Sequence, residues 1–151
     1  MPTDSAHVLN AIVSAVRDAL SPDLISPVYL TARGFRYQDT DNRAVSIKAN
    51  DEDYIHRISG VPLVYVTVDV SYGELHVSDE MQRDTLRLAG SGGVAEHLYR
   101  IRASLIGSYL SNLLTVAMTL ERAGSMAVDD HNPEWIVGTD TYRMAYTVEV
   151  A

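Results

Sequence analysis

Asp129, Asp130 and His131 are adjacent residues whose side chains can bind a metal ion. Carboxylate and imidazole groups are common ligands of calcium and zinc, but adjacent ligands point in different directions unless a loop folds around the ion. The sequence shows no second group of ligands to complete a site, and Asn132-Pro133 favours a turn directly after the trio. We therefore predict a polar turn without a bound metal. A metal-dependent hydrolase built on these three residues is the enzyme alternative.

A histidine and a serine are the next candidates for catalysis. His56 lies close in sequence to Glu52 and Asp53, but an acid–base pair requires geometry as well as proximity, so we expect a solvated surface. Ser108 lies inside a helical pattern and not at the strand-to-helix turn that exposes a nucleophilic serine. The chain has no cysteine, which excludes a thiolate nucleophile, a zinc–thiolate site and a disulfide. We predict that the chain is not an enzyme and uses no cofactor.

A glycine-rich run, Gly90-Ser91-Gly92-Gly93, precedes a helical pattern, as do the loops that hold phosphate at a helix N-terminus. The Lys-Ser/Thr pair of a P-loop and the G-x-G-x-x-G spacing of a dinucleotide fold are both missing. We interpret the run as a flexible connection, and we expect residues 73–94 to form a mobile loop or a short helix.

The composition is typical of one globular domain that spans residues 1–151. Hydrophobic residues make up 46% of the chain, and a chain of this length buries roughly two thirds of its unfolded surface. Twenty acidic and twelve basic residues give a net charge of −8 without a basic cluster, which disfavours binding to nucleic-acid phosphates. No apolar run is long enough to cross a membrane and no signal peptide is recognisable, so we expect a cytoplasmic protein.

Two amphipathic helices are predicted. Residues 5–20 place Leu9, Ile12 and Val16 on one stripe, and this helix ends before Pro22. Residues 95–122 show a longer stripe at steps of three or four residues, with Gly124 as its C-cap. At 1.5 Å per residue the second helix would be about 42 Å long, which exceeds what a small sheet needs. We therefore expect part of it to contact another subunit.

The strand patterns predict an α+β fold. Residues 63–72 alternate valines with polar residues, residues 142–150 alternate in the same way, and residues 28–30 read as a strand entry. Residues 33–49 are interpreted as a weak hairpin. We expect a mostly antiparallel sheet of about four or five strands, with an N-terminal helix and one long helix packed on one face. Tyrosines in the strands are expected to pack across strands, and Trp135 is expected to anchor a loop to the sheet.

The order of these elements, with the stretches LNAIVSAVRDAL, VPLVYVTVDVSY and TYRMAYTVEV, resembles the tail terminator, or tail completion, proteins of long-tailed bacteriophages. The resemblance covers nearly the whole chain. It implies a homo-oligomer, a hexameric ring that caps the tail tube, ends its polymerisation and meets both the tail tube protein and the head-side connector (stopper) protein. It also implies a place in the virion after assembly in the host cytoplasm, with DNA passing through the bore without specific binding. It brings no catalytic residue.

Ring assembly requires contact surfaces, and the edge of a strand at residues 141–150 is one unless the chain itself covers it. The candidate interface residues lie in this strand and in the long helix: Tyr142, Tyr146, Val148, Val150, Tyr109 and Leu113. Two alternatives stay open. The first alternative to a tail terminator is another neck or head–tail connector protein. The second is a small-molecule-binding domain with a cleft between the sheet and the long helix, where His56 or Trp135 would contact the ligand.

Overall fold

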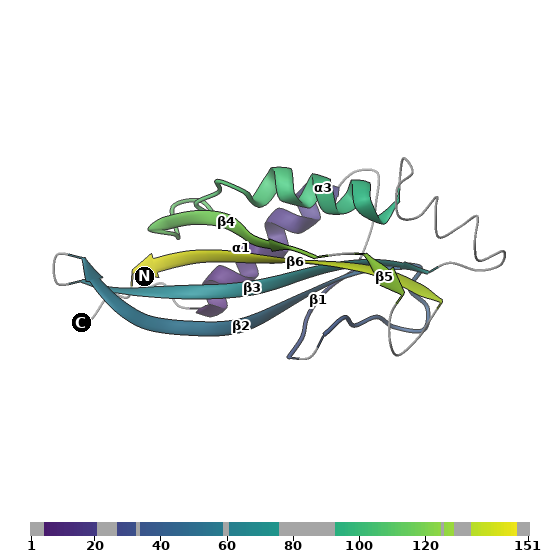
Figure 1. The fold of residues 1–151 in the computed structure, drawn as a ribbon, viewed down its shortest axis with the longest axis horizontal. Coiled ribbons are helices and arrows are strands. Elements are labelled where there is room, and N and C mark those ends of the chain that lie inside the picture. The colour runs from purple at the N-terminus through teal and green to yellow at the C-terminus, as the bar shows by residue number, and fades with distance from the viewer. Residues whose placement is uncertain are drawn as a thin grey trace.

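The computed structural model describes residues 5–20, 27–32, 34–58, 61–75, 93–124, 126–128 and 134–147. Within these ranges the chain forms two helices and six strands, and the strands form one mixed sheet (Figure 1). Five strands follow the order β1-β2-β3-β6-β4, and β5 also pairs with β6. The elements are α1 (Ser5–Leu20), β1 (Val28–Leu30), β2 (Arg43–Ile58), β3 (Val61–Leu75), α3 (Val94–Leu105), β4 (Val116–Ala123), β5 (Ala127–Val128) and β6 (Trp135–Thr147). The predicted α+β class is confirmed.

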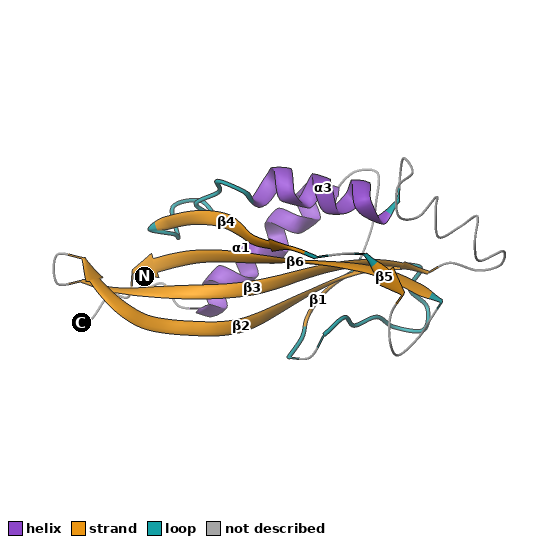
Figure 2. Cartoon of the chain, in the orientation of Figure 1, coloured by secondary structure: helices purple, strands orange, loops and turns teal. Residues whose placement is uncertain are grey.

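The valine row of β3 forms the floor of the core. Val64, Val66, Val68 and Val70 are all buried, because alternate residues of a strand point to one face of the sheet. In the ladder between β3 and β6, Met144 lies opposite Val66 and Tyr142 opposite Val68, which extends the apolar floor onto β6. Both described helices contribute to the same core cluster, so they cover this one face of the sheet (Figure 2).

Helix α1 follows its predicted bounds. Val8, Ile12, Val16 and Leu20 recur every four residues and are buried, which places them in a single stripe along the helix. The stripe packs into the cluster that also holds the apolar residues of α3. Leu9 and Val13 are partly buried beside it. Burial of this stripe is therefore what fixes α1 against the sheet and α3.

The predicted long helix over residues 95–122 is wrong. Helix α3 ends at Leu105, and the chain reverses through a turn that holds Gly107 at φ +80° and three further residues at positive φ, Leu110, Ser111 and Asn112. β4 then begins at Val116. Leu110, Leu114 and Met118 are buried in the same core although they belong to the turn and to β4. Their spacing of four residues is therefore shared with a helix by coincidence, and the excess helix length that suggested a subunit contact does not exist.

The predicted hairpin over residues 33–49 is also wrong. β1 runs parallel to β2, with Val28 opposite Val45, and the antiparallel partner of β2 is β3. The segment between β1 and β2 is tied to the sheet by Ser46, whose Oγ accepts a hydrogen bond from the Arg36 N–H at 2.7 Å and donates one to the Arg36 carbonyl at 3.0 Å. Residues 34–38 therefore lie over one end of the sheet and do not form a strand.

Aromatic packing fixes the same segment. Trp135, the first residue of β6, stacks on Tyr37 with ring centroids 4.3 Å apart and lies 5.4 Å from the ring of Phe35. Phe35 in turn covers Gly73 of β3, where a β-carbon would collide with its ring. Trp135 thus holds the segment of residues 34–38 against the sheet. The loop directly before Trp135, which the sequence predicts it to anchor, lies mostly outside the described residues.

The last strand is confirmed over residues 141–147, and residues 148–150 lie outside the described part of the chain. β6 is a central strand, because β3 pairs with it on one side and β4 on the other. The expectation of a free edge at residues 141–150 is therefore wrong over the described residues. The predicted loop or short helix at 73–94 is mostly undescribed, since residues 76–92 lie outside the described ranges; Gly73 belongs to β3 and Val94 begins α3.

Gly124, predicted as the C-cap of a helix, instead follows β4, and its backbone touches the neighbouring strand. A β-carbon at this position would overlap the carbonyl oxygen of Thr139 in β6. The Gly124 N–H also donates a hydrogen bond to Oδ1 of Asp140 at 3.3 Å. The absence of a side chain is therefore required for β4 to leave the sheet at this point.

We expect Gly124→Ala to lower the free energy of unfolding by at least about 2 kcal/mol, because the clash is with backbone and cannot be relieved by a rotamer change. Urea unfolding followed by circular dichroism measures the loss. The matched control is Gly34→Ala, since a β-carbon at Gly34 would meet no atom within 4 Å. Its effect should stay within about 0.5 kcal/mol, and equal effects of the two variants would contradict this account.

Candidate functional site

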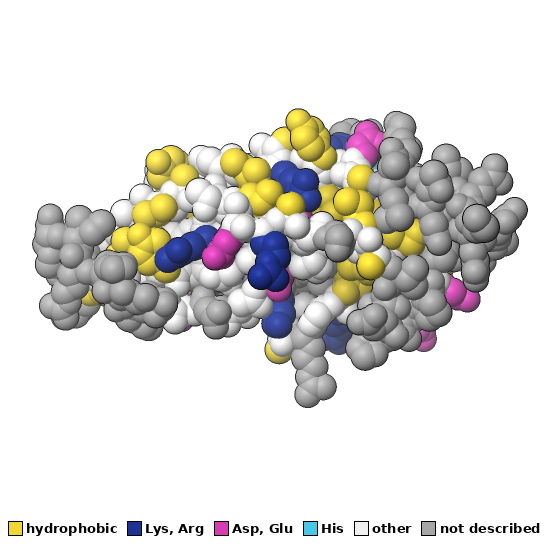
Figure 3. All heavy atoms as spheres, in the orientation of Figure 1, with side chains coloured by type: hydrophobic (Ala, Val, Ile, Leu, Met, Phe, Trp, Pro, Cys, Tyr) yellow, Lys and Arg dark blue, Asp and Glu magenta, His cyan; other side chains and the backbone are white. Residues whose placement is uncertain are grey.

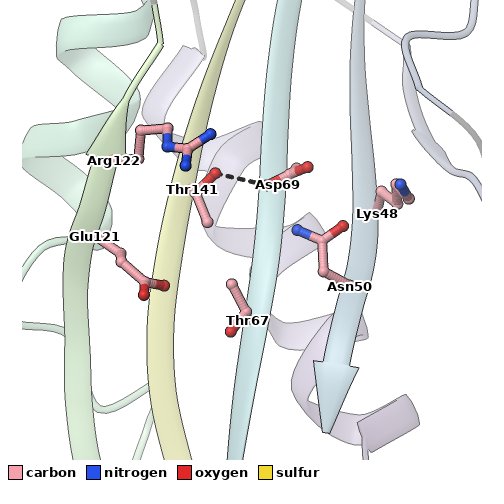
Figure 4. A pocket seen from close by; sticks show the side chains of 7 residues that line it. All are labelled: Lys48, Asn50, Thr67, Asp69, Glu121, Arg122 and Thr141. Carbon is pink, nitrogen blue, oxygen red and sulfur yellow. Dashed lines mark hydrogen bonds between the residues drawn. The ribbon is translucent and has the colours of Figure 1, made fainter.

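The face of the sheet opposite the helices carries a polar hollow. Its volume is about 770 Å³, and it extends across four strands, β2, β3, β6 and β4 (Figure 4). Strand alternation places Thr67 and Asp69 here, since the valines beside them in sequence point into the core. Glu121 and Arg122 are adjacent and both line the hollow where the β4–β6 ladder shifts register. The lining residues are Lys48, Asn50, Thr67, Asp69, Glu121, Arg122 and Thr141.

Hydrogen bonds between neighbouring strands order the floor of the hollow. Asp69 and Thr141 are opposite each other in the β3–β6 ladder, and the Thr141 hydroxyl donates to Oδ1 of Asp69 at 2.7 Å. Ser71 and Thr139 are the next partners in this ladder on the same face, and their hydroxyl groups form a hydrogen bond of 2.7 Å. These pairs hold polar groups at fixed positions on a rigid sheet, which suits a surface that must match another surface.

Charges of both signs surround this floor. Lys48 enters from β2 and Arg122 from β4, on either side of Asp69, while Glu121 lies beside Arg122 (Figure 4). Further along β6, the guanidinium of Arg143 lies 4.5 Å from the centre of the Tyr65 ring, a cation–π contact. Small-molecule pockets are mostly apolar and enclosed. This open, mixed-charge hollow therefore fits a polar protein surface better than a metabolite.

A second surface is apolar and lies on the outer side of α3 and the turn after it. Tyr99 is 68% exposed, Tyr109 52% and Ile106 48%. Tyr99 lies in α3, whereas Ile106 and Tyr109 lie in the turn that follows Leu105. Figure 3 shows hydrophobic side chains gathered over α3 and the turn, with basic side chains below them. Tyrosine is frequent at protein interfaces because it buries a large ring and keeps a polar hydroxyl.

The edges of the sheet are interrupted where the structure describes them. On the outer side of β4, Met118 exchanges hydrogen bonds with the chain's own turn, donating to the Ser108 carbonyl at 2.9 Å and accepting from the Gly107 N–H at 2.8 Å. β1 pairs with residues 45–47 of β2, and the β2–β3 ladder shifts register after Ala49 and again after Asp53. Bulges and covered edges oppose the addition of a further strand.

The structure separates the interface residues predicted from the sequence. Tyr142 and Tyr146 are buried in the core of their own chain, where they pack across strands. Tyr109 is exposed on the α3 side, and Leu113 is partly buried against the core. Val148 and Val150 lie outside the described residues. The exposed apolar surface therefore shares Tyr109 with the prediction and adds Tyr99 and Ile106, which the stripe of a continuous helix had concealed.

The residues considered for catalysis have no common site in the described structure. Asp129, Asp130 and His131 lie outside the described residues, as do Gly90, Ser91, Gly92 and the side chain of His56. Ser108 has a structural role, because its Oγ accepts a hydrogen bond from the Leu110 N–H at 3.0 Å. The described residues contain no group of three or more metal-binding side chains. The space between the sheet and α3, where a ligand cleft was considered, is filled by the core cluster.

Sequence reasoning missed a buried ion pair beneath α3. Asp140 of β6 is fully buried, and Arg102 of α3 binds it through two hydrogen bonds, Nε to Oδ2 at 2.6 Å and Nη2 to Oδ1 at 2.7 Å. Burial raises the pKa of the neighbouring Tyr142 hydroxyl well above its usual value, and the negative charge of Asp140 adds to this shift. Asp140 lies on the same buried face of β6 as Tyr142 and Met144. An acidic residue in this alternating apolar pattern was the sequence feature that could have predicted a buried ion pair.

Glu74, near the end of β3, is a second buried acid. Its Oε1 accepts a hydrogen bond from the Tyr72 hydroxyl at 2.7 Å and lies 3.4 Å from Nε of Arg43. Arg43 is the partner of Glu74 in the β2–β3 ladder, so the two side chains lie on the same face of the sheet. A buried carboxylate is tolerated only with such partners. Asp140 is therefore bound from α3, whereas these partners hold Glu74 from within the sheet.

Comparisons of the chain with protein-family models and with curated protein sequences give no match. No helix among the described residues combines the length and the apolar character that crossing a membrane requires. The fold and its surfaces are therefore the basis for a functional proposal.

We expect Arg102→Met to lower the free energy of unfolding by about 3–5 kcal/mol, because it leaves the Asp140 carboxylate buried without its partner. Chemical denaturation at neutral pH measures this loss. Arg122→Met removes the same charge from the open hollow and is the matched control, with an expected effect within about 0.5 kcal/mol. Similar losses for both variants would show that the buried pair contributes no more to the free energy of unfolding than an exposed charge.

Proposed function

We propose that this chain is the subunit of a ring that caps the tail tube of a long-tailed bacteriophage, ends its polymerisation and joins the tail to the head-side connector. The observation that carries the proposal is the exposed apolar surface of Tyr99, Ile106 and Tyr109 on the α3 side of the molecule. Exposed apolar side chains that gather on one side of a protein indicate a surface for protein contacts. The resemblance of the stretches LNAIVSAVRDAL, VPLVYVTVDVSY and TYRMAYTVEV to tail terminator proteins suggests the kind of assembly.

The position of the exposed apolar residues favours head-to-tail contacts. Gly107 and Ser108 pair with β4, so Ile106 and Tyr109 lie beside the β4 edge of the sheet. Leu30, which is 47% exposed, belongs to β1 at the opposite edge. The apolar residues beside the β4 edge and the exposed Leu30 at the β1 edge allow each subunit to meet the next through unlike faces. Such contacts close into a ring when the rotation between neighbours permits it.

The polar face of the sheet is left for the other partners of the ring. Its cations, Lys48 and Arg122, stand beside Asp69 and Glu121, so a phosphate chain passing over it meets little net attraction. The ordered polar groups of the hollow also offer a matching surface to the tail tube protein or to the head-side connector. In this proposal the ring is a homohexamer in the neck of the virion, assembled in the host cytoplasm, and DNA passes through it without specific binding.

We expect Tyr109→Arg and Leu30→Arg each to prevent ring formation, because each places a charge in one half of the same head-to-tail contact. Native mass spectrometry of the purified chain, and electron microscopy of tubes grown from the tail tube protein in its presence, measure the outcome. The wild-type chain should form rings or end the tubes at a limited length. Both variants should remain monomeric and let the tubes grow on.

Arg17→Glu, on the exposed surface of α1, is the matched control and should assemble like the wild type. Urea unfolding should show unchanged stability for all three variants, since all three positions are exposed. Variants that assemble normally would overturn the proposed contact, and tubes of unlimited length with the wild-type chain would overturn the capping role. Removal of the C-terminal residues is a poorer test, because Tyr146 belongs to the core.

A further inference from the structure

His97 is a buried histidine that faces a buried carboxylate. It lies in the first turn of α3, and its backbone N–H bonds to the carbonyl of Gly93 at 3.2 Å. Nδ1 of its ring lies 3.3 Å from Oε1 of Glu74, and the two side chains are only 5% and 1% exposed. Despite this distance, Nδ1 has no hydrogen-bond partner. A buried polar atom without a partner destabilises the contact in which it lies.

The protonation state of His97 determines how strongly this contact attracts. A neutral imidazole carries one proton: on Nε2 it leaves the bare Nδ1 as an acceptor against the Glu74 carboxylate, and on Nδ1 it allows an uncharged hydrogen bond to that carboxylate. The imidazolium carries a proton on both nitrogens, so Nδ1–H faces Oε1 and a small rotation of the ring completes a charge-assisted hydrogen bond. The contact therefore strengthens as the pH falls.

Charged and titratable groups on the neighbouring strands modulate this contact. Arg43 of β2 opposes a second positive charge, but its side chain is 39% exposed, so water screens it. Tyr72 of β3 shares Oε1 of Glu74 and places its ring 4.9 Å from the imidazole. Asp140 of β6 is already bound by α3. The other titratable groups of the described helices include exposed or half-buried His7, Arg17, Asp18, Glu96, Arg100 and Arg102.

We propose that His97 and Glu74 form a pH-dependent latch that fastens the start of α3 to the end of β3. With His97 protonated, an ion pair joins the helix to the sheet. With His97 neutral, this ion pair is absent, and the apolar contacts of buried Val94 and Leu98 remain. The stabilisation is thus present at low pH and is lost as the pH rises. The latch stands independently of the proposed ring, although α3 carries the surface assigned to subunit contacts.

A double-mutant cycle with His97→Gln and Glu74→Gln tests the latch. Urea unfolding of the full chain and its variants at about pH 5.5 and about pH 8 gives the factor by which the two side chains together change the unfolding equilibrium constant. We expect this factor to be about tenfold larger at the lower pH. His7→Gln, on the exposed side of α1, is the matched control and should show no pH-dependent coupling with Glu74→Gln. An equal factor at both pH values, or a larger one at pH 8, overturns the latch.

Hydrogen exchange of the wild-type chain gives a second test that needs no folded variant. The protection factors of the amides in residues 97–100, corrected for the intrinsic pH dependence of exchange, are compared with those in the middle of α1. We expect the ratio of α3 to α1 protection to rise about tenfold from pH 8 to pH 5.5, because the latched helix opens less often. A ratio that does not change, or that falls, overturns the latch.

Discussion

The burial of Asp140 is the constraint on which the joint between α3 and the sheet depends. A fully buried carboxylate is stable only with a partner, and Arg102 supplies two hydrogen bonds from the last turn of α3. The same carboxylate accepts the N–H of Gly124 where β4 ends. One acid on the central strand therefore sets the position of the helix above it and of the strand beside it. Apolar packing alone would fix neither so narrowly, because it is not directional.

The one-sided packing of the helices determines what the molecule offers to its surroundings. Since α1 and α3 share one core, the opposite face of the sheet must be polar, and hydrogen bonds such as Thr141 to Asp69 order it. The edges of the described sheet are bulged or covered, so they are poor sites for adding strands. Among the described residues, the large apolar side chains that are exposed are Leu30 on β1, Tyr99 on α3, and Ile106 and Tyr109 in the turn after α3. With these edges the described sheet is a poor template for adding a further strand.

The sequence pattern predicted correctly those elements whose buried residues follow a single periodicity within the element. The four-residue stripe of α1 and the valine row of β3 need only their own periodicity, and both predictions hold. The stripe over residues 95–122 failed because Leu110, Leu114 and Met118 keep helical spacing while the chain turns and becomes a strand. The central place of β6 depends on pairing with distant strands, which no local pattern contains. The buried acids could be suspected from the sequence, because each occupies a position of a strand whose alternate residues are buried. Their partners could not be predicted, because the fold brings them together.

The central position of β6 also affects how the chain is made. β6 is the last of the described strands to leave the ribosome, yet it joins β3 to β4 and completes the floor of the core. Until it emerges, the β2–β3 hairpin and β4 have no common sheet, and one long side of β3 has no partner within the described chain. A nascent chain in this state offers open strand edges to other chains. The described sheet can therefore close only after β6 has been made.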